Sequence, residues 1–323
     1  MVNNSYTDDL IAQAINKHYM WVLCSIGVPA NSLTIVVIMT MQTLTPATFL
    51  IATLALVDGC ALISKFAFML LDFYDVPLCK SYFLVYFLSM MANWTLMYIC
   101  LERFFTLCCP QKMIPIITLR RCLVCLSITA AALLSYLVPV FSVMLFWNYN
   151  EDSCWVYDEY EAFLNNYHKW INETLVLFIP YATILVLTIR IVVKLRVNPE
   201  ENSRSEAQTP GNVNVLQENQ SDERVSTTML LCCAIFFITF TVPSLLYFLI
   251  DSESVMYPKT FRQIKFLLYD STHALNFFLY FLSATRFRRQ CCKLFAGCRQ
   301  SCWRGAGNES GLEEVPLKRS LVK

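Results

Sequence analysis

The sequence predicts an all-α membrane protein, a bundle of seven membrane-spanning helices followed by a short amphipathic eighth helix. The chain of 323 residues is 56% hydrophobic and 15% charged, whereas soluble domains average about 45–50% apolar and about 25% charged residues. Its apolar residues fall in seven runs of about the length that a bilayer requires, roughly 20 residues per helix. The runs are continuous rather than alternating, which favours helices over the strands of a barrel.

The seven runs follow one another along most of the chain. The fourth is longer than one crossing needs, and the second and seventh contain the acidic residues Asp58 and Asp270. In order, the runs are residues 19–41, 48–64, 81–101, 122–150, 174–189 with its apolar flanks, 225–250 and 266–285.

The distribution of basic residues predicts the orientation in the membrane. Of the 25 Lys and Arg residues, six fall on the side of Met1, eighteen fall on the other side, and Lys65 belongs to the second span, directly after its apolar run. Because segments rich in Lys and Arg remain in the cytosol, we expect a multi-pass plasma-membrane protein with its N-terminus outside. The acidic residues are more numerous on the outer side, so the outer face is predicted to be net acidic.

The domain boundaries follow from these assignments. We expect an extracellular N-terminal tail over residues 1–18, the helical domain over 19–285, and the amphipathic helix with a cytosolic C-terminal tail over 286–323. Within the helical domain, residues 198–221 are dominated by Asn, Glu, Gln and Ser, a composition typical of a disordered loop.

Composition also argues against several classes of protein. The net charge of +1 provides no basic excess for binding nucleic acid. The three histidines, His18, His168 and His273, are scattered and cannot form a catalytic metal cluster, so we expect neither enzymatic activity nor a cofactor. A seven-helix channel or transporter is the alternative from another class, but it would show internal repeats or polar residues along several spans.

Short motifs occur in a characteristic order over about residues 19–300. They are Gly27-Val28-Pro29-Ala30-Asn31, Leu54-Ala55-Leu56-Val57-Asp58, Glu102-Arg103-Phe104, Pro180, Phe237 with Pro243, and Asn276-Phe277-Phe278-Leu279-Tyr280. In this order and on these spans, the motifs resemble those of the rhodopsin-like (class A) G-protein-coupled receptors.

The resemblance implies a receptor that binds an extracellular ligand and activates a heterotrimeric G protein by outward motion of the sixth span. Arrestin, a receptor kinase and membrane lipid are further partners that it implies. The stretch 275–289 looks like invertebrate neuropeptide receptors of the FMRFamide-receptor-like kind, and an acidic outer face with aromatic residues suits a basic, aromatic peptide. A chemosensory or other small-ligand receptor is the alternative within the family.

Several positions depart from the family pattern. Thr241 stands in place of the Trp of the sixth span, and Phe277 in place of the Pro of the seventh, so we expect other residues to couple the ligand to helix motion. Val85 stands where amine receptors carry an Asp, which disfavours a biogenic amine. Asp270 stands where opsins carry their retinal-linking Lys, and a Schiff base requires an amine.

Ionisable residues inside spans are costly and mark functional or paired groups. In the family, an acid such as Asp58 helps to bind sodium together with Asn276. Ala92 stands in place of the family's Ser partner, so the sodium site is in doubt and no metal site is predicted. His273 lies three residues before Asn276, on the same helical face, and either bonds Asp58 in place of an ion or is an ordinary satisfied core histidine.

Lys65 and Asp270 are predicted to meet between the second and seventh spans. Lys65 lies seven residues after Asp58, two turns toward the outside, and Asp270 lies six residues before Asn276, also toward the outside. The pair is interpreted either as the floor of a ligand pocket or as a structural clamp. Tyr82, Tyr86 and Ser89 are the other candidate ligand-binding residues, with core packing as the alternative for the aromatic ones.

The resemblance predicts a second pair at the inner end of the bundle, where Arg103 contacts Glu102 and Glu223 in the inactive form. Glu223 lies twenty residues before Pro243, about 30 Å along a helix, although a solvated acid at the membrane edge is the alternative. The predicted activation switch comprises Asp58, Glu102, Arg103, Glu223, Phe237, Pro243, His273, Asn276 and Tyr280.

Candidate sites of modification are sorted by side of the membrane. Cys79 and Cys154 fall in the outer segments, and the receptor architecture with an oxidising exterior predicts a disulfide between them. Asn3 is the usable glycosylation acceptor in the outer tail. Cys291 and Cys292 follow the seventh span and are candidates for palmitoylation, with ordinary reduced thiols as the alternative.

Overall fold

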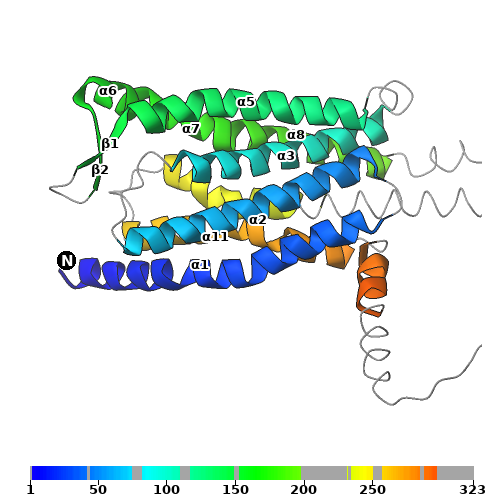
Figure 1. The fold of residues 1–323 in the computed structure, drawn as a ribbon, viewed down its shortest axis with the longest axis horizontal. Helices are drawn as coiled ribbons and strands as arrows, with labels where there is room; N and C mark the ends of the chain where they lie inside the picture. Colours follow the sequence, from blue (N-terminus) through cyan, green and yellow to red (C-terminus); the bar gives the residue numbers. More distant parts are fainter. Residues whose placement is uncertain are drawn as a thin grey trace, which may run out of the picture.

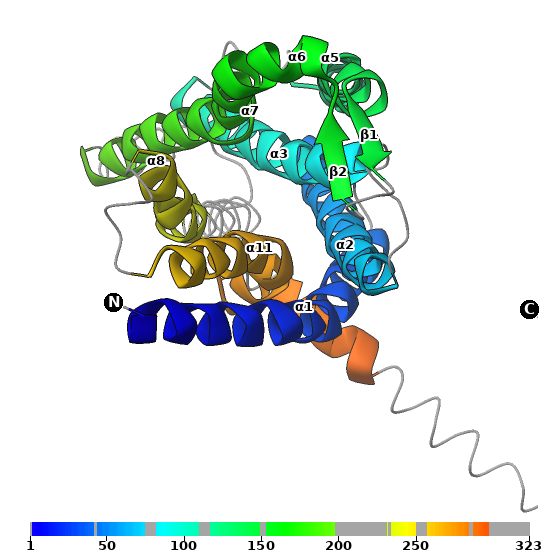
Figure 2. The same ribbon diagram turned by 90° about the vertical axis from the view of Figure 1, so that its left-hand side faces the viewer.

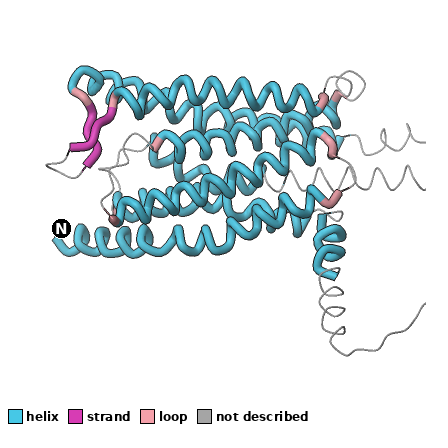
Figure 3. Tube along the Cα trace, in the orientation of Figure 1, coloured by secondary structure: helices cyan, strands magenta, loops and turns pink. Residues whose placement is uncertain are grey.

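The computed structural model is a bundle of long helices that lie side by side (Figure 1). It describes residues 2–41, 44–74, 82–109, 117–148, 153–197, 231, 234–249, 257–283 and 287–296. The first four bundle helices are α1 (Val2–Met39), α2 (Pro46–Phe73), α3 (Phe83–Cys108) and α5 (Leu119–Val143). The predicted all-α fold is confirmed, with one short β-hairpin as the strand element of the described residues (Figure 3).

The remaining helices complete the bundle. The fifth is continuous through α6 (Asp158–Phe163), η2 (Leu164–His168), α7 (Lys169–Glu173), η3 (Thr174–Phe178) and α8 (Ile179–Val197). The sixth is Ala234–Leu249, the seventh is α11 (Pro258–Ser283), and a short helix over 287–296 follows. Seen along its axis, the bundle places α3 between α2, α5 and α8, with α1 beside α11 (Figure 2).

Length and apolarity agree with crossing a membrane. Five of the described helices are long and apolar enough, over Tyr6–Met39, Pro46–Leu71, Phe83–Cys108, Leu119–Val143 and Asp158–Lys194. Ala234–Leu249 is apolar but shorter. α11 matches the others in length, although polar residues such as Asp270, His273 and Asn276 interrupt its apolar sequence.

Local sequence explains where several helices begin. At the start of α2, Thr45 and Thr48 cap the helix reciprocally, with Thr45 N donating to Thr48 Oγ1 at 2.8 Å and Thr48 N donating to Thr45 Oγ1 at 3.2 Å. Pro46 occupies the first helical position, where its missing N–H removes no helical bond. α5 begins after Thr118, whose hydroxyl accepts from Arg121 N at 3.4 Å.

The overlong fourth apolar run divides into a helix and the first strand of a hairpin. α5 ends at Val143, and the chain continues as β1 (Leu145–Asn148), which pairs antiparallel with β2 (Ser153–Val156) in a register that sets Leu145 against Val156. The hairpin and the start of α1 lie at one end of the bundle, which we call the hairpin end (Figure 1). We call the opposite end, where α3 finishes and the 287–296 helix lies, the Arg103 end.

The first helix differs from its predicted bounds. α1 begins at Val2 rather than at Tyr19, so most of the predicted tail continues the membrane helix upstream. Asp8 stabilises this extension, because its carboxylate accepts from Lys259 N at 3.0 Å and from Thr260 N at 2.8 Å. These are unpaired N–H groups in the first turn of α11, which a side-chain oxygen satisfies.

Gly27 permits the close approach of α1 to its two neighbours. A Cβ atom at this position would lie 2.5 Å from Leu62 Cδ1 and 2.8 Å from Ala274 Cβ. At Gly59, the nearest atom to an added Cβ is Asn31 Cβ at 3.6 Å, an ordinary contact.

Gly27→Ala is therefore expected to destabilise the bundle by about 1–3 kcal/mol, the usual cost of overpacking a core. The measurement is the melting temperature of the detergent-solubilised protein, together with its surface expression. Gly59→Ala is the matched control and should leave both unchanged. Equal tolerance of the two substitutions would contradict the close contact at Gly27.

Candidate functional site

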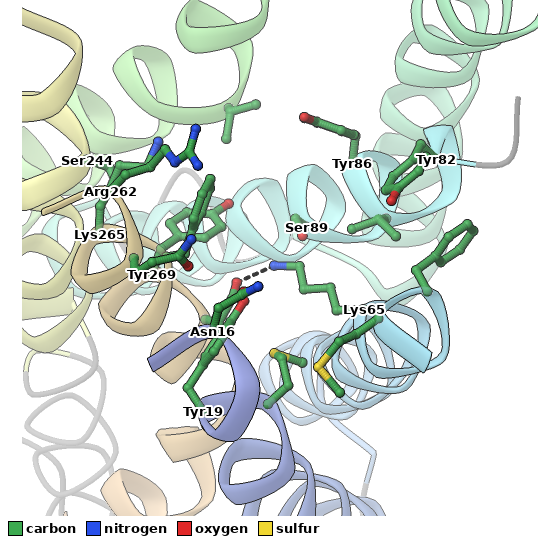
Figure 4. Close-up of a pocket in the computed structure, with 18 of the residues that line it drawn as sticks. Asn16, Tyr19, Lys65, Tyr82, Tyr86, Ser89, Ser244, Arg262, Lys265 and Tyr269 are labelled. Atoms are coloured by element: carbon green, nitrogen blue, oxygen red, sulfur yellow. Dashed lines mark hydrogen bonds and ion pairs between the residues drawn. The ribbon is translucent and has the colours of Figure 1, made fainter. Parts of the chain in front are cut away.

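A cavity of about 560 Å³ lies between the helices at the hairpin end. Residues from α1, α2, α3, α7, η3, Ala234–Leu249 and α11 line it (Figure 4). The sequence-predicted ligand candidates all belong to this lining, namely Lys65, Tyr82, Tyr86, Ser89 and Asp270. Residues that are far apart in the chain therefore meet in one concave site, the usual form of a small-ligand site.

The predicted pairing of Lys65 with Asp270 is present in the cavity wall. Lys65 Nζ donates to Asp270 Oδ1, and the two side chains are 14% and 4% exposed. The other carboxylate oxygen, Oδ2, accepts from the Tyr19 hydroxyl at 3.4 Å, and the ammonium lies 5.2 Å from the centre of the Tyr269 ring. The pair is thus enclosed by aromatic groups from α1 and α11.

The cavity contains charges of both signs beyond this pair. Glu173, Arg262 and Lys265 line it as well. Lys265 Nζ lies 4.4 Å from the ring centre of Tyr247 and the same distance from that of Phe266, so part of its charge is stabilised by cation–π contact. Because the lining contains both basic and acidic side chains, it is less acidic than the outer face as a whole is predicted to be.

Sequence reasoning missed several members of this lining. On α11, Arg262, Lys265 and Tyr269 recur at intervals of three and four residues and end beside Asp270, which is the spacing of one helical face. That spacing was the available signal. Asn16 could not be found in the same way, because the sequence predicts an extracellular tail for the stretch that carries it.

Among the described residues of the cavity lining, Ser89, Asn172 and Gln263 each have a buried side-chain oxygen without a protein partner. Ser89 is 6% exposed, and among the described residues its hydroxyl has no hydrogen-bond partner. Because an unpaired buried hydroxyl is costly, Ser89 is placed to bond a polar group that enters the cavity.

Deeper in the bundle, both carboxylate oxygens of Asp58 are hydrogen-bonded to side chains of α11. His273 Nδ1 and Asp58 Oδ1 are hydrogen-bonded at 2.7 Å, and Asn276 Nδ2 donates to Asp58 Oδ2 at 2.7 Å. The bond between His273 and Asp58 that the sequence suggested is therefore present. Asn31 Nδ2 donates to His273 O at 2.8 Å and joins α1 to the same cluster. In the part of the chain that the structure describes, no group of three or more His, Cys, Asp or Glu residues could hold a metal ion.

At the Arg103 end, the neighbouring pair of the predicted switch is formed. Arg103 Nε lies 3.2 Å from Glu102 Oε2, although the two groups are not aligned as a hydrogen bond. Thr106 Oγ1 donates to Glu102 Oε1 at 3.3 Å. Glu223, the other predicted partner of Arg103, lies outside the described residues.

The departures from family motifs have structural counterparts. Thr241 is fully buried, and its hydroxyl donates within its own helix, to Phe237 O at 2.8 Å. Phe277 has its ring centre 5.9 Å from that of Phe281 and 5.7 Å from that of Phe287. A ring at this position therefore joins α11 to the 287–296 helix, a role that proline could not serve.

The remaining predicted sites are placed only in part. Phe237 is buried and Pro243 lies in the same helix, Ala234–Leu249. The side chains of Asn3, Cys154 and Tyr280 are outside the description, as are Cys79 and the loop over 198–221.

The two palmitoylation candidates occupy different environments in the 287–296 helix. Cys291 is buried, and burial raises the pKa of its thiol. Cys292 is exposed. The exposed thiol is therefore the more accessible of the two for acylation.

Breaking the Lys65–Asp270 pair is expected to destabilise the protein strongly. Lys65→Met or Asp270→Asn alone leaves a buried charge without its partner, at a cost of about 3–5 kcal/mol. The double variant should recover part of this loss. The measurements are thermal stability in detergent and surface expression.

The exposed pair of Lys259 with Asp9, 54% and 38% exposed, supplies the control. Lys259→Met should cost no more than about 0–1 kcal/mol. If Lys65→Met is as well tolerated as Lys259→Met, the buried pair does not stabilise the bundle.

Comparison with known proteins agrees with the geometry. The sequence model described as 7 transmembrane receptor (rhodopsin family) matches residues 30–285, most of the chain. A search of curated proteins found no significant match. The matched region contains all seven helices of the bundle except the first part of α1. The chain therefore belongs to the rhodopsin family of seven-transmembrane receptors, the G-protein-coupled receptors of class A.

Proposed function

We propose that this receptor binds an extracellular peptide in the cavity at the hairpin end and activates a heterotrimeric G protein at the Arg103 end. The observation that carries the proposal is the cavity itself, whose lining combines Lys65, Asp270, Glu173 and Arg262 with aromatic rings. Such a lining suits a ligand that offers charged, amide and aromatic groups together, as a peptide does.

The distribution of charge supports the proposed orientation. Arg103, Arg120, Arg121, Arg190 and Lys194 gather toward the Arg103 end. Positive residues at membrane edges favour the cytosolic side. This supports a plasma-membrane receptor with the cavity open to the outside, and a cytosolic surface that a G protein, arrestin and receptor kinase would share.

Features beyond the cavity favour a peptide over a small molecule. Trp155 and Tyr157 are exposed near the hairpin, and the first turn of α6 contains Asp158, Glu159 and Glu161. Aromatic and acidic groups outside the cavity extend the recognition surface and favour a ligand with basic and aromatic residues.

A small-ligand or chemosensory receptor is the second candidate. The cavity volume of about 560 Å³ lies within the range of about 300–1,000 Å³ found for small-ligand sites. The volume alone therefore accommodates either a small molecule or the end of a peptide.

A screen of a peptide library against cells that report calcium and cyclic AMP tests the proposal. We expect a response to basic, aromatic peptides such as those ending in Arg-Phe-amide. Glu173→Gln, which removes a carboxylate of the cavity lining, should lower the potency of an active basic peptide by about tenfold, roughly the loss of one charge-assisted bond. Lys17→Gln, which removes a charge at the same end but outside the cavity, is the control. Activation by small metabolites alone would favour the second candidate.

The proposed activation step releases Arg103 as the sixth helix, Ala234–Leu249, moves outward. If Glu223 restrains Arg103 in the resting receptor, Glu223→Ala should raise basal G-protein activation at equal surface expression, because it removes a contact that favours the inactive state. Glu218→Ala, in the predicted disordered loop, is the control. Unchanged basal activity in Glu223→Ala would contradict the proposed restraint.

A further inference from the structure

The fifth membrane helix contains a π-helical turn, η3, beside Pro180. Proline has no backbone N–H, so the carbonyl four residues earlier, that of Val176, lacks its usual helical donor. Ile179 N donates to Thr174 O, five residues back, which is the hydrogen bond of a π-helix. The helix is therefore irregular at a place where it faces α3.

Two neighbouring side chains of α3 supply the missing donors. Asn93 Nδ2 donates to Val176 O at 2.9 Å, and Trp94 Nε1 donates to Leu175 O at 3.0 Å. Buried backbone carbonyls need a partner. The irregular turn is therefore stabilised by α3 rather than by its own helix.

Asn93 also reaches the seventh helix. Its Nδ2 donates to the Tyr269 hydroxyl at 2.8 Å, and the residue is 2% exposed. A side-chain amide nitrogen carries two hydrogens, so Asn93 joins Val176 and Tyr269 at the same time. One buried amide thus links the fifth helix, α3 and α11.

Tyr269 connects this amide to the ligand cavity. It lines the cavity, and Lys65 Nζ lies above its ring (Figure 4). The ring of Tyr269 also meets that of His273 edge to face, with centres 5.5 Å apart. A group that enters the cavity beside Lys65 therefore contacts the residue that Asn93 bonds.

We propose that Asn93 and Tyr269 are positioning residues that couple the cavity to the fifth helix, and that their hydrogen bond stabilises the resting arrangement of the bundle. A ligand that displaces the Tyr269 ring breaks this bond and frees Asn93, so the turn at Val176 loses its link to α11. Thr241 cannot serve this role, since its hydroxyl bonds its own helix. The pairing of Arg103 with Glu102 agrees with a resting arrangement.

Tyr269→Phe tests the proposal because it removes the hydroxyl and keeps the ring. Loss of one buried neutral hydrogen bond is expected to raise basal G-protein activation about three- to tenfold at equal surface expression. The readout is a panel of G-protein activation sensors in cells. Basal activation in the double variant Asn93→Leu with Tyr269→Phe should be no higher than in the more active of the two single variants. Each substitution alone already removes the Asn93–Tyr269 bond.

Two variants separate coupling from simple loss of structure. Tyr98→Phe removes another interhelical phenol bond, that of Tyr98 to the Thr129 hydroxyl at 2.7 Å, away from the cavity. Trp94→Phe removes a donor to the same irregular turn but leaves the link to Tyr269 intact. Both should lower thermal stability slightly without changing basal activation.

Hydrogen–deuterium exchange of the purified receptor gives a second readout. The signalling readout rests on the proposed function, whereas exchange does not. Tyr269→Phe should speed amide exchange over Thr174–Phe178, while Tyr98→Phe leaves it at the wild-type rate. Unchanged exchange in Tyr269→Phe overturns the coupling. Faster exchange with unchanged activation supports the mechanical link but overturns its role in signalling.

Discussion

The ion pair between Lys65 and Asp270 is largely buried inside the helix bundle, where water screens the two charges weakly. Charges in such surroundings are stable only when they are paired and bonded, so α2 and α11 must keep the positions that bring the two groups together. Tyr19 and Tyr269 complete the enclosure of the pair. The cavity is therefore built around a contact that is expected to stabilise the bundle.

The same requirement recurs at other depths between these helices. Nearer the hairpin end, Asp8 caps the start of α11, and deeper in the bundle Asp58 bonds His273 and Asn276. Gly27 permits this arrangement because it lets α1 approach Leu62 and Ala274 closely. Polar groups that are unsatisfied on one helix are thus satisfied by the next, which sets the order and register of α1, α2 and α11 within a largely apolar bundle.

This explains which parts of the site could be predicted from the sequence. A charge within an apolar run has few available partners, so spacing alone led from Lys65 to Asp270. Asn93 gave no comparable signal, because an amide in an apolar run has many potential partners, and Pro180 revealed a missing donor without revealing its replacement. The helical extension of α1 lacked apolar periodicity, and its stability depends on the tertiary contact of Asp8 with α11. The end of α5 at Val143 was hidden because β1, the first strand of the hairpin, continues the uncharged apolar sequence of the helix.

The altered family motifs also fit one physical scheme. Position 277 carries phenylalanine instead of proline, and its ring packs against Phe281 and Phe287. The seventh helix therefore keeps the backbone hydrogen bond that a proline would remove. Thr241 is bonded to its own helix, so position 241 offers no large side chain to sense a ligand. A polar contact between α3 and α11 is suited to replace it, because one hydrogen bond contributes about 0.5–1.5 kcal/mol. That is comparable to the few kcal/mol that separate conformations of one protein, so a ligand need disturb only a small contact to change the balance between them.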